Sequence, residues 1–399
     1  MKKSINDLVD VKGKIALVRV DINAPLNAEK VVTDDTRLTA IIPTIRKMQE
    51  LGLKIVLLAH LGRPKGERNL EFSLEPVGKR LSELLGEEVT FVSDCVGEIP
   101  QAIVKSLKEG QIALLENVRF YGEETKCDPD FSAKLAKLGD IYVNDAFGAA
   151  HRAHSSTAGV AQILPTAVSG LLMEKELSAL GGLLENPARP FTAIVGGAKI
   201  SSKIGVLENL LDKVDNLIIG GGMAYTFVKA NGGKIGSSIC EDDQMDVALA
   251  IQKKAQEKGV NLVMATDVLV ADDFSNDANV KVVPVAEIPD GFEGVDAGPE
   301  SIKAFEETIK ASKTILWNGP VGAFEIEKFT NGTREVAKAV YEVTKTGAVT
   351  VLGGGDTVAA VKKYGYKNAD FSHVSTGGGA SLEFIEGKTL PGVAALNDK

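Results

Sequence analysis

Short apolar runs rich in β-branched residues recur along the whole chain, and stretches with apolar residues at helical spacing separate them. Runs of about four to six such residues are typical of buried parallel strands. Because strands and helices alternate, the pattern predicts an α/β fold with parallel sheets. We expect strands at 15–20, 55–59, 89–92, 112–115, 141–143, 192–195, 217–219, 262–265, 281–285, 314–317 and 349–352. The clearest expected helices are 39–50, 98–109, 242–258 and 332–346.

These strands fit either one eight-stranded α/β barrel with additions or two open sheets. The segment 171–186 favours two sheets, because it predicts one long helix, interrupted at Gly181-Gly182 and ended at Asn186-Pro187. The length of 399 residues is also typical of two or three domains. We therefore expect this helix to connect two halves of similar size.

Composition excludes several classes of protein. Hydrophobic residues make up 44% and charged residues 25%, which is ordinary for a globular chain and excludes wholesale disorder. The net charge of −9 is opposite to that of a non-specific nucleic-acid binder. Three scattered cysteines, Cys95, Cys127 and Cys240, indicate neither a disulfide framework nor a zinc site. No apolar run approaches the ~20 residues of a membrane span, and the first residues lack a signal core, so we expect a cytoplasmic protein.

Cationic residues gather in the first half of the chain, where they follow the predicted strands. If the sheet is parallel, the residues after neighbouring strands meet at one edge, and a cationic pocket for a small polyanion results. For any single arginine, a surface ion pair is the alternative. The polar residues in these positions are Asp21, Asn23, Arg37, His60, Arg63, Arg119 and Arg152.

Four apolar runs in the second half end in glycine-rich turns, at 196–197, 220–222, 353–355 and 377–379. A strand, two or more glycines and a helix start let the backbone approach an anion closely, although a glycine at a tight turn is often only structural. Lys199 and Lys203 are four residues apart, which predicts a shared helix face. Asp356 is positioned either to hold Mg²⁺ beside phosphate oxygens or to cap a helix.

Familiar catalytic and nucleotide motifs are missing. There is no G-x-x-x-x-G-K-[ST], no G-x-G-x-x-G after a strand, no protein-kinase set and no G-x-S-x-G elbow. His60, His151 and His154 lack the carboxylate spacing of a transition-metal site. The residues alone leave open a phosphotransferase, a nucleotide-regulated binding protein without catalysis, and a kinase for a sugar or another small molecule.

The sequence resembles the phosphoglycerate kinase family along essentially its whole length. Ile22, Ala24 and Ala149 depart from residues common in the family, but none of these changes removes a charged group. The matching stretches are RVDINAPL (19–26), HLGRPKG (60–66), LLENVRF (114–120), NDAFGAAHRAHSS (144–156), GGAKISSKIGVLENLL (196–211), WNGPVGAFE (317–325), LGGGDT (352–357) and STGGGASLEFIEGKTLPGV (375–393).

The resemblance implies two Rossmann-like domains with parallel sheets, joined by a long helix, with a C-terminal tail that packs back on the N-terminal domain. The implied parts are a 3-phosphoglycerate-binding domain at 1–170, the helix at 171–186, a nucleotide-binding domain at 187–385 and the tail at 386–399. The implied reaction is reversible phosphoryl transfer from 1,3-bisphosphoglycerate to MgADP, in glycolysis and gluconeogenesis. A cytoplasmic monomer with a hinge, and with neither nucleic acid nor membrane as a partner, is also implied.

The resemblance also implies roles for individual residues. Arg37, Lys203, Gly378 and Gly379 would neutralise the transferring phosphoryl group, and Asp356 would serve the Mg²⁺ of the nucleotide. The implied 3-phosphoglycerate site consists of Asp21, Asn23, Arg37, His60, Arg63, Arg119 and Arg152. The implied nucleotide site consists of Gly197, Lys199, Lys203, Asn318, Glu325, Gly354, Gly355, Asp356 and Thr357.

Overall fold

The computed structural model describes all 399 residues, which form two compact units. Unit 1 comprises Met1–Ser178 with Thr389–Lys399, and unit 2 comprises Ala179–Lys388. Helix α7 (Leu171–Glu185) contributes residues to both. Its helical structure is continuous through Gly181-Gly182, so the predicted interruption is wrong: each glycine costs about 1 kcal/mol of helix propensity but, unlike proline, keeps its N–H donor.

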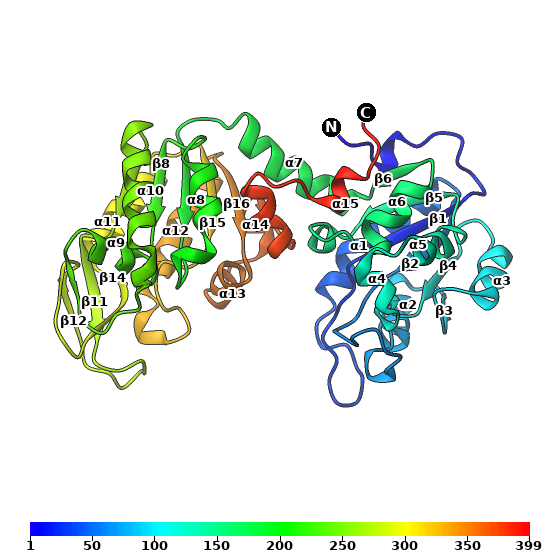
Figure 1. Cartoon of the computed structure of the whole chain (residues 1–399), viewed down its shortest axis with the longest axis horizontal. Coiled ribbons are helices and arrows are strands. Elements are labelled where there is room, and N and C mark those ends of the chain that lie inside the picture. The colour runs from blue at the N-terminus through cyan, green and yellow to red at the C-terminus, as the bar shows by residue number, and fades with distance from the viewer. The chain divides into compact units, whose positions relative to one another are not determined.

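Unit 1 is built on a six-stranded sheet in the order β3-β4-β2-β1-β5-β6, and every neighbouring pair is parallel. The predicted α/β class is therefore confirmed for this half of the chain (Figure 1). The strands are β1 (Ile15–Val20), β2 (Lys54–Leu58), β3 (Val89–Val92), β4 (Ile112–Leu115), β5 (Ile141–Asp145) and β6 (Ala167–Ser169).

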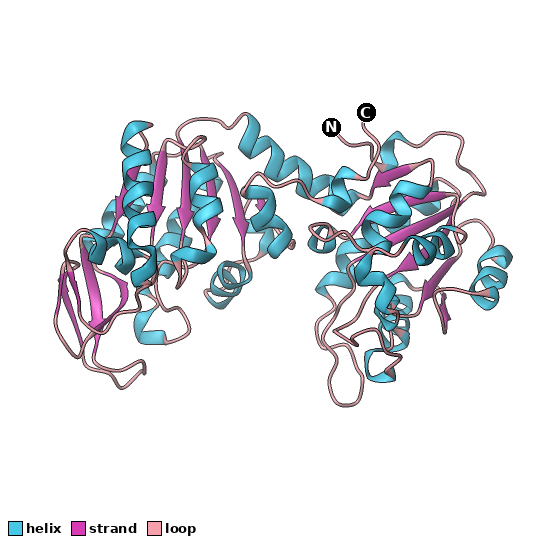
Figure 2. Ribbon diagram, in the orientation of Figure 1, coloured by secondary structure: helices cyan, strands magenta, loops and turns pink.

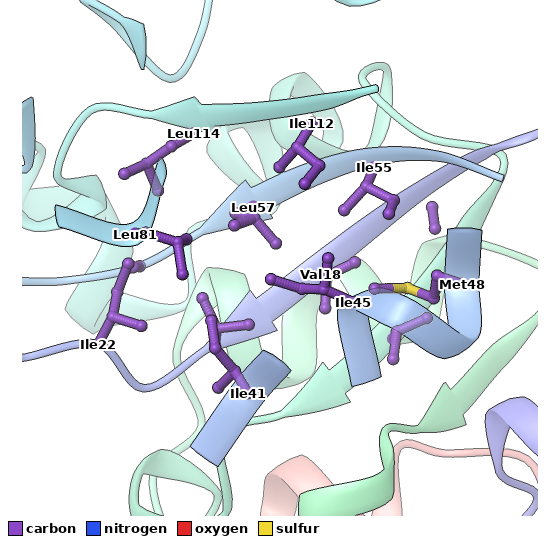
Figure 3. Packing of buried hydrophobic residues seen from close by; sticks show 14 of the residues in the cluster. Val18, Ile22, Ile41, Ile45, Met48, Ile55, Leu57, Leu81, Ile112 and Leu114 are labelled. Atoms are coloured by element: carbon purple, nitrogen blue, oxygen red, sulfur yellow. The ribbon is translucent and has the colours of Figure 1, made fainter. Parts of the chain in front are cut away.

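Helices cover both faces of this sheet, and alternate residues of each strand supply the two cores. Val18 and Leu57 pack with Ile45 of the first long helix (Figure 3), whereas Leu17 and Val56 belong to the core of the opposite face. This alternation is the period of two that strands impose on side chains. The helices of unit 1 are α1 (Thr36–Glu50), α2 (Glu75–Leu85), α3 (Glu98–Ser106), α4 (Gly122–Lys126), α5 (Pro129–Ala136), α6 (Val160–Ile163) and α15 (Pro391–Ala394).

The C-terminal segment Thr389–Lys399 belongs to unit 1. The Asn397 backbone N–H donates to the Ala167 carbonyl at 2.8 Å, and Asn144 Nδ2 donates to the Gly392 carbonyl at 3.1 Å. Lys2 forms an ion pair with Asp398 at 3.0 Å. These bonds hold both ends of the chain beside β5 and β6.

None of the helices in either unit combines the length and apolarity needed to cross a membrane.

Unit 2 contains a second parallel six-stranded sheet, in the order β10-β8-β7-β15-β16-β17 (Figure 2). Its strands are β7 (Phe191–Val195), β8 (Asn216–Ile219), β10 (Asn261–Met264), β15 (Thr314–Asn318), β16 (Val349–Gly353) and β17 (His373–Val374). Its helices are α8 (Ile204–Leu210), α9 (Ala224–Ala230), α10 (Met245–Glu257), α11 (Pro299–Lys310), α12 (Asn331–Lys345), α13 (Gly355–Lys363) and α14 (Gly379–Ile385).

A smaller antiparallel sheet of unit 2 corrects one prediction. Strand β12 (Val280–Pro284) covers most of the run 281–285, but it pairs antiparallel with β11 (Asp267–Ala271) and is largely exposed. β12 lies at the edge of its sheet, so one side of the strand has no neighbouring strand and its side chains stay exposed. A β-branched run therefore does not by itself predict a buried strand. For the same reason β10 is only partly buried. The sheet is completed by β14 (Glu293–Ala297), and β9 (Lys234–Ile235) pairs with β13 (Glu287–Ile288).

Candidate functional site

A cationic pocket of about 460 Å³ lies at the carboxyl ends of strands in unit 1. The structure brings together Arg63, Arg119 and Arg152, which follow β2, β4 and β5, because the parallel order places the ends of these strands at one edge. No carboxylate lines the pocket. The residues that line it are Arg63, Lys65, Gly66, Arg119, Tyr121, Gly122, Thr125, Lys126 and Arg152.

Arg119 is destabilised as a cation, first by burial and then by the neighbouring arginines. Its Nη1 donates to the Gly62 carbonyl at 3.1 Å, while its Nε is buried without a hydrogen-bond partner. Burial, together with the charges of Arg19, Arg152 and Arg63, lowers its pKa to about 10. A donor held in this way gains most from an anion, because the anion supplies both the missing acceptor and the missing charge.

Arg19 lies beside this site, and no role for it was predicted from the sequence. It lies within β1, its side chain is fully buried, and its Nη2 lies 2.8 Å from His60 Nδ1. Because a guanidinium only donates, His60 Nδ1 must accept, and the ring proton is left on Nε2. Burial and the charge of Arg19 hold the pKa of His60 well below its ordinary value, so the ring is neutral at pH 7.

A buried carboxylate completes the surroundings of Arg19. Arg19 Nε donates to Ser156 Oγ at 2.8 Å, and Ser156 Oγ donates to Glu124 Oε1 at 2.6 Å. Burial raises the pKa of Glu124, while Arg19 and the bonds from Ser156 oppose that change. The sequence signal for this network is a charged residue within an otherwise apolar strand, since such a residue needs buried partners.

Arg37, Asp21 and Asn23 lie beside this network without lining the pocket itself. Arg37 Nη1 donates to Asp21 Oδ2 at 2.6 Å, and nearly half of the Arg37 side chain is exposed. Asn23 Oδ1 accepts from the Gly62 backbone N–H at 3.0 Å. Gly62 therefore connects Asn23 with Arg119, since its N–H donates to Asn23 and its carbonyl accepts from Arg119.

His154 makes the stability of unit 1 dependent on pH. Burial and the charges of Arg119 and Arg19 lower its pKa to about 4, from an ordinary value near 6.5. Between these values the unfolded chain binds a proton that the folded chain does not, so the free energy of unfolding falls as the pH falls. We expect His154→Gln to remove about 2 kcal/mol of the decrease between pH 7 and pH 4.5, allowing for solvent screening. Urea unfolding at both pH values measures this, and equal decreases in the two proteins would contradict it.

The glycine-rich turns of unit 2 pack against one another at the carboxyl edge of the second sheet. The Gly196 N–H donates to the Asn318 carbonyl at 2.9 Å, and the Gly221 N–H donates to the Val321 carbonyl at 3.0 Å. A Cβ on Gly196 would lie 2.0 Å from the Pro320 carbonyl oxygen, and Gly319 has φ +100°. Gly196 and Gly319 are thus needed for the close approach of two backbones.

A second pocket, of about 290 Å³, lies between these turns and the small sheet of unit 2. It brings together three predicted residues: Gly197, Glu325 and Asp356. The pocket wall does not include the other predicted nucleotide-site residues, which are Lys199, Lys203, Asn318, Gly354, Gly355 and Thr357. The lining residues are Gly197, Ala198, Gly221, Gly222, Tyr225, Ile239, Phe274, Glu293, Gly294, Val295, Pro320, Val321, Gly322, Ala323, Glu325 and Asp356.

Lys199 and Lys203 do not share a helix face, which corrects the prediction. Lys199 has extended backbone and precedes a 3-10 turn at Ile200–Ser202, and α8 begins only at Ile204. Lys199 is exposed, whereas Lys203 is half-buried and its Nζ donates to Asn318 Oδ1 at 2.5 Å. Burial lowers the pKa of Lys203, and the charges of Asp356 and Glu386 oppose that change.

Two helices begin at the remaining predicted residues. Gly354, with φ +88°, is the residue that precedes α13. Asp356 therefore lies in the first turn of α13 and does not cap the helix. Its side chain is exposed. Thr357 is buried, and its Oγ1 accepts from the Gly319 N–H at 2.7 Å. Gly378, with φ +52°, precedes α14, which begins at Gly379. The first turns of α13 and α14 offer free N–H groups to an anion.

Comparison with known proteins identifies the family. The family model described as "Phosphoglycerate kinase" matches residues 5–388. Cytosolic phosphoglycerate kinase 3 of Arabidopsis thaliana is 54% identical over 399 residues, which cover 100% of this chain and 99% of that protein. Phosphoglycerate kinase of Synechococcus elongatus is 54% identical over 98% of this chain and 96% of its own. The solved phosphoglycerate kinase of Coxiella burnetii is 42% identical over 99% and 98% of the two chains, with a TM-score of 0.92. The chain belongs to the phosphoglycerate kinase family.

Proposed function

We propose that this chain binds 3-phosphoglycerate or 1,3-bisphosphoglycerate in the cationic pocket of unit 1 and the magnesium-bound adenine nucleotide at the glycine-rich turns of unit 2. Phosphoglycerate kinase activity, a phosphotransferase reaction of glycolysis with a carboxyl acceptor, follows from membership of the family. The observation that carries the placement of the substrate is the cluster of arginines and lysines around a pocket without a carboxylate.

In unit 1, Arg63, Arg119 and Arg152 hold the anionic groups of the phosphoglycerate by charge-assisted hydrogen bonds. The Nε2–H of neutral His60 donates to an oxygen of the substrate. Asp21 and Asn23 orient the substrate hydroxyl, and Arg37, whose only carboxylate partner is Asp21, turns from that partner toward the transferring phosphoryl group.

In unit 2, the 290 Å³ pocket takes the nucleoside, with Glu325 at the ribose and the loops at Gly197 and Pro320-Val321 as walls. Lys199, Lys203 and the helix starts at Gly354-Gly355 and Gly378-Gly379 hold the phosphates. Thr357 supports this arrangement through its bond to Gly319. Asp356, exposed and without an ion-pair partner, fits a Mg²⁺ and would hold it beside the nucleotide phosphates, where a bound ion would supply positive charge.

Transfer then requires placement and positive charge rather than a general base. The attacking group is a carboxylate or a diphosphate oxygen, each already ionised at pH 7. Arg37, Lys203 and the N–H groups at Gly378-Gly379 stabilise the charge of the moving phosphoryl group during in-line transfer. Because each unit holds one of the two anions, the units must bring their substrates together, and this closure excludes water from a hydrolysable acyl phosphate.

We expect Arg119→Ala to weaken 3-phosphoglycerate binding about 10- to 100-fold, because a charge-assisted bond with a buried donor is lost. Calorimetric titration with 3-phosphoglycerate measures this. The matched control is Arg46→Ala, which removes an arginine of the same unit that pairs with Glu87 and does not line the pocket. Equal affinity of wild type and Arg119→Ala would refute the placement of the substrate.

A coupled assay tests the reaction itself: ADP should form from MgATP only when 3-phosphoglycerate is present. A binding protein without catalysis would bind nucleotide and release no ADP, and a sugar kinase would ignore 3-phosphoglycerate. We further propose that the chain acts in the cytosol as a monomer, in keeping with relatives named as cytosolic.

A further inference from the structure

Two cations of the unit 1 pocket lie on an irregular segment between β2 and α2, which we call the pocket loop (residues 61–72). Arg63 and Lys65 belong to it, and both side chains are exposed. Lys65 has φ +59°, a conformation that a residue other than glycine keeps only where its surroundings hold it. Because the backbone places these side chains, the shape of the pocket depends on what fixes the loop.

The side chain of Asn117 bonds to both ends of the pocket loop. Asn117 is the second residue after β4, and it is fully buried. Its Nδ2 donates to the Leu61 carbonyl at 2.8 Å and to the Phe72 carbonyl at 2.9 Å. Both protons of the amide are therefore used, and together they close the loop.

Asn117 also holds the backbone of Arg119. Its Oδ1 accepts from the Arg119 N–H at 3.1 Å. The Arg119 carbonyl in turn accepts from the Gly66 N–H at 3.2 Å, in the middle of the pocket loop. The loop and the turn that carries Arg119 are thus held against each other, and Asn117 bonds to both.

We propose that Asn117 is a positioning residue for the phosphoglycerate, because its amide sets the spacing of Arg63, Lys65 and Arg119 around the anion. An anion that several cations hold at once is sensitive to the distances between them. An apolar side chain at this position would leave two buried carbonyls and one N–H without partners. This inference rests on the proposed substrate site and adds to it the group that shapes that site.

Asn117→Asp is the sharpest test, since it keeps the shape of the side chain and the acceptor for the Arg119 N–H but loses both donors. We expect the KM for 3-phosphoglycerate to rise about tenfold, while kcat and the KM for MgATP change less than about twofold, because binding of the substrate is weakened rather than the transfer step. Asn117→Leu removes the same bonds without adding a charge and should have the same effect.

The matched control is Asn144→Asp. Asn144 is as deeply buried in unit 1, donates to the Gly392 carbonyl and accepts from the Ala146 N–H. Its replacement therefore makes the same chemical change away from the pocket loop and should keep the wild-type KM for 3-phosphoglycerate. Loss of both substrates together in the Asn117 variants, or an equal rise in the control, would show a structural role alone and overturn the inference.

Hydrogen exchange of the pocket-loop amides in the ligand-free protein separates this inference from the proposed function. Exchange should quicken about tenfold in both Asn117 variants and stay unchanged in Asn144→Asp. If the wild type does not bind 3-phosphoglycerate while the loop is loosened in this way, the proposed substrate is wrong and the role of Asn117 in shaping the pocket is upheld. Unchanged exchange, an unchanged KM, or an effect of Asn117→Asp that Asn117→Leu does not share would overturn the inference.

Discussion

Lys203→Ala should lose about 10²- to 10³-fold in kcat while the protein stays folded. The Lys203 ammonium is half-buried, forms no ion pair in the free enzyme and bonds only to Asn318 Oδ1. Its charge is therefore available for a phosphoryl group, and burial strengthens its attraction to developing negative charge. Initial rates with saturating 3-phosphoglycerate and MgATP measure the loss, and thermal unfolding measures stability.

The control for this variant is Lys229→Ala, which removes a partly exposed lysine of unit 2 that pairs with Asp242. Loss of a surface pair of this kind costs at most about 1 kcal/mol and should leave the rate unchanged. Arg37→Ala should behave like Lys203→Ala, because both groups serve the moving phosphoryl. A Lys203→Ala enzyme with near-normal turnover would remove Lys203 from the mechanism.

The strands at the centre of each sheet could be predicted from the sequence because burial on both faces leaves a continuous apolar run. Thus β1, β4 and β15 lie within about a residue of their predicted bounds. Edge strands escape this rule: β12 has the same β-branched composition yet is mostly exposed. The three-residue strand β6 and the two-residue β17 are too short to leave any pattern, and they exist because β5 and β16 offer free edges.

The cationic pocket could be predicted because parallel strands bring the residues after them to one edge. Arg63, Arg119 and Arg152 are exposed or half-buried there, in positions that sequence order determines. Local backbone conformation could not be predicted in the same way. The break between Lys199 and α8 depends on how Gly196 and Gly197 pack against the loop at Gly319, a tertiary contact that residue spacing does not encode.

The buried network around Arg19 could not be predicted from residue spacing either, because its partners come from distant parts of the chain. Arg19→Met keeps the length of the side chain but leaves His60 Nδ1, Ser156 Oγ and the Val20 carbonyl without a donor. It also removes the positive charge that acts on buried Glu124. We expect the free energy of unfolding to fall by about 3–5 kcal/mol, because one partner of a buried charged network is lost. Urea unfolding followed by circular dichroism measures the change.

Glu124→Gln provides the test that separates this network from simple packing. If Arg19 mainly compensates the Glu124 carboxylate, the double variant should be more stable than the sum of the two single losses predicts, by about 1–3 kcal/mol. Arg46→Met controls for removing an arginine and should cost less than about 1 kcal/mol, since Arg46 is partly exposed and pairs with Glu87 at the surface. Additive losses would show that Arg19 and Glu124 act independently. A loss from Arg19→Met no larger than that of the control would show that His60 and Ser156 hold their positions without Arg19.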